Sequence, residues 1–303
     1  MAINFSVGIC AHNEAANIEK VIKSILDQKL SPDIQLKEII IVSSASTDNT
    51  NQIIVELKKR NPLIRLFVEK IRRGKSRAVN KFIKNAKSDY LVLTSADLYL
   101  DKNCLNILLT ELQTKQVGMV APRVIPINKP DHVAGYAVHL QYRLFHRINL
   151  QFPERPRVGE LIAFKKIFDR IPPSSAVDEA NIEPLIYLQD YTVKYCPLAI
   201  VYNKGPETIR DFLSQRRRIY AGHSQLKSKY GYQVVTYSNF RILGTLLADF
   251  DWNVKNWGML FSVICLEAIG RLAGFIDYKL RVRNHTVWKI AKSTKNLSQS
   301  SNF

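Results

Sequence analysis

Short apolar runs alternate with amphipathic stretches through the first third of the chain. Residues 3–11, 38–44, 64–70 and 89–95 have the length and apolar content of buried strands. Between these runs, residues 14–28, 47–59 and 75–86 place apolar side chains at helical spacing. This alternation predicts an α/β fold with a mainly parallel sheet flanked by helices.

The pattern changes in the second half of the chain. Residues 153–173 are irregular, residues 177–189 are helical, and residues 191–203 predict short strands. A helix is predicted over residues 205–223, with Pro206 in its first turn and the acidic Glu207 beside it.

The segment 256–283 is rich in apolar and aromatic residues. A helix that spans a membrane needs about 20 largely uncharged residues, and Glu267 and Arg271 interrupt this one at a spacing that lets them pair. We therefore predict an amphipathic helix that lies at a membrane surface. A helix packed on the rest of the chain, or on a second copy in a homo-oligomer, is the alternative.

The net charge of the chain is +18, and it is unevenly distributed: residues 203–303 hold 16 Lys and Arg against 6 Asp and Glu. Such a balance indicates a phosphate-bearing ligand or an anionic membrane surface, or simply a solvated basic surface. We expect no nucleic-acid partner, because no recognised nucleic-acid motif and no interleaved stacking aromatics accompany the charge. The four cysteines lack metal-ligand spacing, and the N-terminus predicts a strand rather than a signal peptide, so a cytoplasmic location is expected.

Three polar segments follow predicted strands: AHNE (11–14), SSASTDNT (43–50) and SADLYLD (95–101). Ligands of such sheets bind beyond the carboxyl ends of the strands, so these segments are the candidate site. The chain has neither a Gly-x-Gly-x-x-Gly fingerprint nor a Walker loop, which argues against dinucleotide and P-loop chemistry.

Together with RRGKSRAVN (72–80), VDEA (177–180) and QRRRIYAG (215–222), these segments resemble family 2 glycosyltransferases in order and approximate spacing. The resemblance covers about residues 3–225. It implies an inverting enzyme of the GT-A fold that uses a nucleotide-diphospho-sugar, here a UDP- or GDP-sugar. It also implies a catalytic domain over residues 1–225, followed by a helical region over 226–303 for a membrane interface or oligomerisation.

The resemblance gives roles to the strand-end residues. Asp97 aligns with the second aspartate of the Asp-x-Asp motif, which reaches Mg²⁺ or Mn²⁺, and such an ion assists departure of the diphosphate. Ser95 stands in place of the first aspartate, with Ala96 between them; a helix cap is the alternative role of Asp97. Candidate contacts of the nucleotide are Ala11, His12, Glu14, Ser44 and Lys75, and Ser44 replaces an aspartate that accepts from the base. For Asp48 we expect a helix cap, and for Arg72 and Arg73 a solvated surface is an equal alternative.

An inverting transfer needs a base for the proton of the acceptor hydroxyl. The resemblance assigns this role to Glu179, with Asp178 as the alternative because glutamate adds a methylene to the usual aspartate; both could instead be exposed acids at a helix start. Gln215, Arg217 and Arg218 would lie by the diphosphate and the acceptor, while His223 is expected to be packed.

Ile219 replaces the tryptophan of processive polysaccharide synthases, which favours transfer of one sugar to a lipid-linked or glycan acceptor. A processive polysaccharide synthase and a catalytically silent nucleotide-sugar binder, with Ser43, Ser44 and Ser95 as eroded positions, are the alternatives. Together, the family resemblance and the apolar C-terminal helix imply a peripheral or monotopic protein of cell-envelope glycan synthesis at the cytoplasmic face of a membrane.

Overall fold

The computed structural model describes residues 3–173, 177, 179–231, 244–245, 254–280, 282 and 294. The predicted alternation over the first third is confirmed, with boundaries shifted by a few residues. The strands there are β1 (Ile3–Ala11), β2 (Ile34–Ser44), β3 (Ile64–Glu69) and β4 (Tyr90–Ser95), and the helices are α1 (Ile18–Leu26), α2 (Thr50–Arg60) and α3 (Lys75–Asn85). β1 pairs in parallel with β2 and β4, and β2 in parallel with β3.

The chain after β4 adds elements that the sequence pattern did not predict. They are β5 (Leu98–Leu100), α4 (Cys104–Leu112), β6 (Val117–Pro126), α5 (Val133–Gln151) and β7 (Leu161–Lys165). β7 falls in the stretch 153–173 and pairs antiparallel with β4 and with β6. The short strands expected over 191–203 form instead one strand, β8 (Thr192–Asn203), because it pairs in parallel along β6 through a register shift.

Among the described residues, the strands form one mixed sheet in the order β3-β2-β1-β4-β7-β6-β8-β5. Side chains of α1, α2 and α4 pack on one face of the sheet, and those of α3 and of α6 (Ile182–Tyr187) pack on the other. The predicted helix over 177–189 is therefore α6 with a short 3₁₀ turn, η1 (Glu179–Asn181), before it. The result is a three-layer α/β fold with a core on each face of the sheet.

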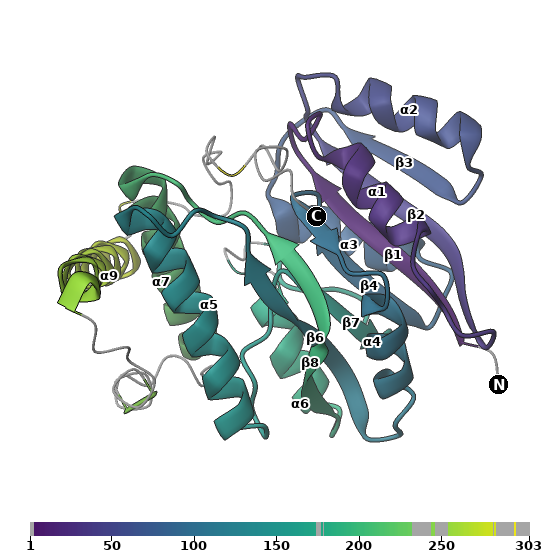
Figure 1. Ribbon diagram of the computed structural model, residues 1–303. Coiled ribbons are helices and arrows are strands. Elements are labelled where there is room, and N and C mark those ends of the chain that lie inside the picture. The colour runs from purple at the N-terminus through teal and green to yellow at the C-terminus, as the bar shows by residue number, and fades with distance from the viewer. Residues whose placement is uncertain are drawn as a thin grey trace.

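Two long helices and α5 form a group beside these layers (Figure 1). They are α7 (Ile209–Tyr230) and α9 (Val254–Leu280). The expected start of α7 at Pro206 is wrong: Thr208 is its N-cap, and the Thr208 side chain accepts from the backbone N–H of Asp211 at 3.1 Å. α7 runs across residue 225, and the division into residues 1–225 and 226–303 stays a prediction.

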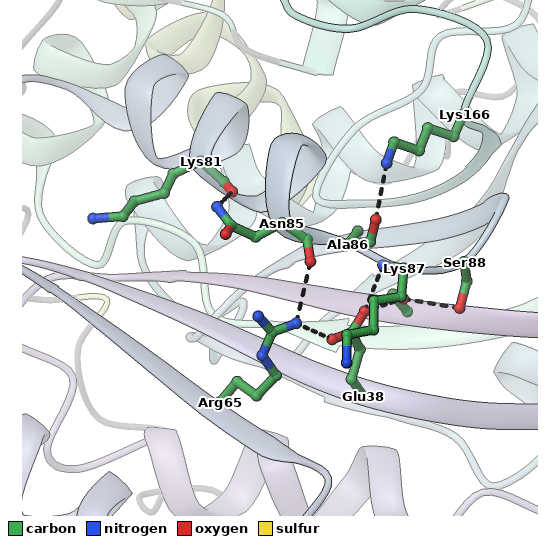
Figure 2. Close-up of polar contacts among 9 residues, drawn as sticks. Glu38, Arg65, Lys81, Asn85, Ala86, Lys87, Ser88 and Lys166 are labelled. Carbon is green, nitrogen blue, oxygen red and sulfur yellow. Dashed lines mark hydrogen bonds and ion pairs between the residues drawn. The ribbon is translucent and has the colours of Figure 1, made fainter.

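A buried carboxylate ties the amino-terminal part of β2 to the end of α3 (Figure 2). Glu38 is 4% exposed. Its Oε1 accepts from Ser6 Oγ at 2.9 Å and from the backbone N–H of Lys87 at 2.7 Å, and its Oε2 pairs closely with Arg65. Arg65 also donates to the carbonyl of Asn85 at 3.1 Å, at the last residue of α3. The cluster fixes β2, β3 and α3 relative to one another.

We expect Glu38→Gln to lower the free energy of unfolding by about 1–3 kcal/mol, since hydrogen bonds to a buried charge are lost. Burial alone would raise the pKa of Glu38, but the hydrogen bonds from Lys87, Arg65 and Ser6 outweigh it and lower the pKa below 4.5. A lowered folded-state pKa stabilises the fold above the unfolded pKa, and that stability is lost as the pH falls through the folded value. The difference between the two proteins in urea unfolding should therefore shrink as the pH falls below 4.5, and a pH-independent difference would contradict the assignment. Exposed Glu56→Gln is the control, with no expected change.

Candidate functional site

A cleft of about 770 Å³ opens at the carboxyl ends of β1, β2 and β4. This is the edge at which doubly wound sheets bind ligands. Thirteen site residues were predicted, of which Arg217 does not line the cleft and Asp178 lies outside the described residues. The other eleven line the cleft together: Ala11, His12, Glu14, Ser44, Lys75, Ser95, Ala96, Asp97, Glu179, Gln215 and Arg218. Residues that are far apart in the chain thus share one cavity.

The loops after β1 and β2 hold each other in place. His12 Nδ1 lies 2.7 Å from the carbonyl oxygen of Ser44, and the backbone N–H of Glu14 donates to Thr50 Oγ1 at 2.8 Å. Asp48 accepts from the backbone N–H groups of Thr50, the first residue of α2, and of Ala15 at 3.0 and 3.1 Å. The N-cap of α2 is Asn49, so Asp48 binds the start of this helix from the position before the cap. These bonds fix one wall of the cleft.

Four non-glycine residues in the described part of the chain have a positive φ, and three of them lie at the cleft; the fourth, Asp190, does not line it. Asn13, Ala45 and Glu160 have φ values of 53°, 53° and 64°, in the left-handed region that side chains other than glycine rarely adopt. Each lies beside or among the residues that line the cleft. Strained backbone collects at functional sites, which supports the assignment of this cleft as the site.

Lys75 lines the cleft at the start of α3. Gly74 precedes it with a φ of 97°, a conformation that favours glycine. The Lys75 ammonium donates to Ser95 Oγ at 3.2 Å and forms a close ion pair with the Glu179 carboxylate. Lys75 therefore joins the polar end of β4 to the turn before α6.

Glu179 and Asp97 differ in how their protonation is controlled. Burial would raise the pKa of Glu179, but the charge and hydrogen bond of Lys75 outweigh it, so the pKa is lowered and the carboxylate is charged. For Asp97 burial and the charge of Glu160 raise the pKa to about 6, against the opposing effect of Lys75. Negative charge is thus crowded around Asp97, and a bound cation would relieve it. Asp178, the alternative base, lies outside the described residues.

Within the described residues, no group of three or more His, Cys, Asp and Glu side chains has the arrangement of a metal site. Asp97 and Glu160 both line the cleft. Burial and the charge of Glu160 disfavour the ionised form of the Asp97 carboxyl. One or two carboxylates suit Mg²⁺ or Mn²⁺, because these ions are commonly held by few protein oxygens together with phosphate oxygens and water. The residues present therefore fit an ion that arrives with a phosphate ligand.

On α7, Gln215 and Arg218 face the cleft but Arg217 does not line it. The Arg217 guanidinium forms a close two-bond ion pair with Asp277 of α9, whose side chain is fully buried. The structure thus separates Arg217 from the other two predicted residues and gives it a role in joining α7 to α9.

Glu160 and Lys204 are charged residues of the cleft that were not predicted. Glu160 accepts from the Tyr142 hydroxyl at 2.9 Å, and buried Lys204 pairs with Glu207 at 3.0 Å. Arg72 lines the cleft, whereas Arg73 is exposed. Glu160 lies in a stretch without a helical or strand signal, and Tyr142 lies in α5, a helix that was not predicted. No local sequence pattern therefore indicated either residue.

α9 carries an apolar face that the rest of the described chain leaves open. Phe261, Leu272 and Leu280 are 70%, 61% and 70% exposed. Among the described residues, Trp257–Leu280 is long and apolar enough to cross a membrane, judged by length and composition alone. The predicted pair within it is present, since Arg271 Nε donates to Glu267 Oε1 at 2.8 Å.

Comparison with known proteins adds sequence relatives. The family described as glycosyl transferase family 2 matches residues 6–171. The chain is 26% identical over 233 residues to the poly-beta-1,6-N-acetyl-D-glucosamine synthase of Staphylococcus aureus, covering 72% of this chain and 54% of that protein. It is 25% identical over 288 residues to the protein of the same name from Staphylococcus epidermidis, covering 89% and 66%. The chain therefore spans about half to two thirds of the length of these relatives.

Among solved structures, the chain is similar to a mannosyltransferase from Pyrobaculum calidifontis in complex with GDP-mannose and Mn²⁺. The TM-score is 0.64 at 18% identity, covering 93% of this chain and 89% of that one. At this identity the likeness concerns the fold, and the predicted GT-A type of α/β fold is confirmed.

Proposed function

The chain belongs to glycosyl transferase family 2, and from that premise we propose that it is an inverting glycosyltransferase. The donor is a nucleotide-diphospho-sugar, either a UDP- or a GDP-sugar, and the acceptor is a hydroxyl of a lipid-linked or glycan molecule. The observation that carries the proposal is the convergence of Lys75, Asp97 and Glu179 in one cleft with Gln215 and Arg218. A cation-binding carboxylate, a base and two donors for a leaving diphosphate are what such a transfer requires.

The donor would occupy the part of the cleft lined by strand ends. His12, Glu14 and Ser44 line the nucleotide side. Ser44 Oγ donates to Glu69 Oε2 at 2.8 Å, so a carboxylate lies beside the serine that replaces the family's aspartate. Lys75 and Arg218 would contact the diphosphate, because ammonium and guanidinium groups form charge-assisted hydrogen bonds with phosphate oxygens.

Asp97, with Glu160 near it, would hold Mg²⁺ or Mn²⁺ against the donor diphosphate. When bound, the ion supplies Lewis-acid stabilisation of the charge that develops on the departing diphosphate. Ser95 would hydrogen-bond the donor in place of the missing aspartate.

Glu179 is the proposed base. The acceptor oxygen forms a bond to the anomeric carbon, the bond from that carbon to the diphosphate breaks, and the nucleoside diphosphate leaves with the electron pair. Glu179 takes the proton of the acceptor hydroxyl. In the free protein the carboxylate is paired with Lys75, and a diphosphate would compete for the same ammonium. Donor binding would thus free Glu179 to accept the proton.

Residues on the acceptor side of the cleft bear on whether the enzyme transfers a single sugar or extends a polymer. Ile219 lines the cleft where processive synthases carry a tryptophan, which supports transfer of single sugars. The similarity to poly-beta-1,6-N-acetyl-D-glucosamine synthases favours the second candidate, a processive polysaccharide synthase. The length of the products made from one acceptor distinguishes the two.

The exposed apolar face of α9 and the basic balance of residues 203–303 support attachment to an anionic membrane surface. The cytoplasmic face of that membrane is the proposed location. A homo-oligomer that covers the same face is the alternative.

We expect the purified protein to transfer or hydrolyse one UDP- or GDP-sugar only when Mg²⁺ or Mn²⁺ is present. The measurement is nucleoside diphosphate release across a panel of both donor classes, with and without a membrane lipid extract as the acceptor source. Inversion is read from the anomeric configuration of the product by NMR. Donor binding without turnover on any acceptor would instead support a catalytically silent binder.

Arg218→Gln is expected to lower kcat/KM by about 10²-fold, the usual cost of removing one preorganised donor to a developing charge. The matched control removes the neighbouring arginine with its partner, as Arg217→Gln combined with Asp277→Asn, because loss of Arg217 alone would leave a buried carboxylate unpaired. The double variant should keep kcat/KM within about threefold of the unaltered protein. Equal losses in both variants would contradict the distinction between the two arginines.

A further inference from the structure

A second, smaller cavity lies between α5, α7 and α9, the group of helices beside the sheet (Figure 1). Its volume is about 140 Å³. Four residues line both this cavity and the main cleft: Gln141, Arg157, Ile219 and His223. The smaller cavity therefore adjoins the proposed acceptor side of the cleft.

Most of the wall of the smaller cavity is apolar. α5 contributes most of these side chains, α7 adds two and α9 adds one: Ala137, Leu140, Leu144, Phe145, Ile148, Phe212, Ile219 and Val263. Beyond this wall, α9 continues as the helix whose outer face exposes apolar side chains. An alkyl chain could thus leave the cavity along an apolar path.

The remainder of the wall carries an excess of positive charge. Three guanidinium groups, those of Arg157, Arg216 and Arg271, face the cavity together with one carboxylate, Glu267. Burial and these three guanidinium groups lower the pKa of His223 to about 3, so its ring is neutral. Two positive charges therefore lack a compensating carboxylate in the lining of this cavity.

Arg216 carries the strongest sign of a missing ligand. It is 8% exposed, and its Nε has no hydrogen-bond partner among the residues that the structure describes. Within the described residues, the carboxylate that pairs with Arg216 is that of Glu267, whose Oε2 lies 3.9 Å from Arg216 Nη1. The other oxygen of Glu267, Oε1, accepts from Arg271 Nε at 2.8 Å. A buried guanidinium with an unused N–H is costly unless an anion completes it.

Close helix packing builds the cavity. A Cβ atom at Gly270 of α9 would lie 2.6 Å from Arg216 Cβ, and one at Gly274 would lie 2.6 Å from the carbonyl oxygen of Arg217. At these two positions only glycine permits this approach of α9 to α7. The close packing of α9 against the start of the Arg216 side chain therefore limits where the guanidinium group can lie.

We propose that this cavity binds the phosphate group of a lipid-linked sugar, the acceptor of the transfer. Arg216, with Arg157 and Arg271, holds the phosphate, and the lipid chain follows the apolar wall formed by α5 and α9. The sugar then extends past Ile219 into the cleft, with its hydroxyl toward Glu179. This inference rests on the proposed function for the role of the ligand, but the binding site itself can be tested without turnover.

The test is binding of dodecyl phosphate, below its micellar concentration, measured by isothermal titration calorimetry. Dodecanol lacks the phosphate, inorganic phosphate lacks the chain, and phosphatidylglycerol vesicles present a phosphodiester within a membrane. We expect dodecyl phosphate to bind at least about tenfold more tightly than dodecanol or inorganic phosphate. Equal binding of either fragment, or binding of the vesicles alone, would overturn the proposal.

Arg216→Gln should weaken binding of dodecyl phosphate by about 10- to 100-fold, as expected for loss of a charge-assisted contact. Leu144→Trp, which fills the cavity and keeps every charge, should weaken it as strongly with an unchanged thermal midpoint. Arg143→Gln, the same charge change on the exposed face of α5, is the matched control and should bind normally. Normal binding by Leu144→Trp would overturn the proposal even if Arg216→Gln failed to fold.

Donor binding, measured on the same samples, separates the two levels of inference. If a nucleotide sugar is turned over and dodecyl phosphate does not bind, the lipid-phosphate site is wrong and the proposed function stands. If dodecyl phosphate binds through Arg216 and no nucleotide sugar is bound or turned over, the site stands and the proposed function is wrong.

Discussion

Glu179→Gln is expected to lower kcat for sugar transfer by about 10³-fold, within the usual contribution of a general base. Glutamine has the shape of glutamate but cannot take the acceptor proton. Donor binding should be unchanged or tighter, because Lys75 loses its ion pair with the carboxylate and is then available to the diphosphate. The measurements are single-turnover transfer at saturating acceptor and calorimetric titration of the donor.

Two variants make the Glu179 result specific. Asp178→Asn tests the alternative base, and Glu56→Gln makes the same change on an exposed pair with Lys59. We expect both to keep most of the activity. Full activity in Glu179→Gln, with loss in Asp178→Asn, would move the base to Asp178 and contradict the assignment argued above.

The elements that the sequence predicted well are those with local signals. β1 to β4 and α1 to α3 show their apolar period within single segments, and their bounds came within a few residues. β7 could not be predicted this way, because it lies among prolines and its partners β4 and β6 are distant in sequence. β8 was divided into short strands for a similar reason: its continuity depends on pairing with β6.

The residues of the candidate site also divide into those with a local sequence signal and those placed by tertiary packing. Residues at strand ends, such as His12 and Asp97, reach the cleft because parallel strands end at one edge of the sheet. On α7, Gln215 and Arg218 are three apart and share a helix face, whereas Arg217 points elsewhere and meets Asp277. The sequence prediction placed all three residues by the diphosphate and did not apply this helical spacing to Arg217. The contribution of Glu160 depends on tertiary packing and its φ of 64°, neither of which leaves a local sequence signal.

Asp97→Asn is the second change with a large expected effect: about a 10³-fold loss of metal-dependent kcat/KM. An ion that assists departure of the diphosphate contributes several kcal/mol to transition-state stabilisation, and each 1.36 kcal/mol corresponds to a tenfold change in rate. An amide removes the charge that would attract the ion but keeps the size of the side chain. Binding of Mn²⁺ in the presence of nucleoside diphosphate, followed by electron paramagnetic resonance, should weaken in parallel.

The matched control for Asp97→Asn is Asp101→Asn, four residues along the same segment. Asp101 accepts from the backbone N–H of Asn103 at 3.1 Å and does not line the cleft. Asparagine keeps an oxygen that can accept the same N–H, so Asp101→Asn should change stability little and leave both Mn²⁺ binding and transfer unchanged. Because the charge change is identical, a general electrostatic effect would weaken Mn²⁺ binding in both variants. A loss confined to Asp97→Asn assigns the ion to the carboxylate that follows β4, the one aspartate kept where the family usually has two.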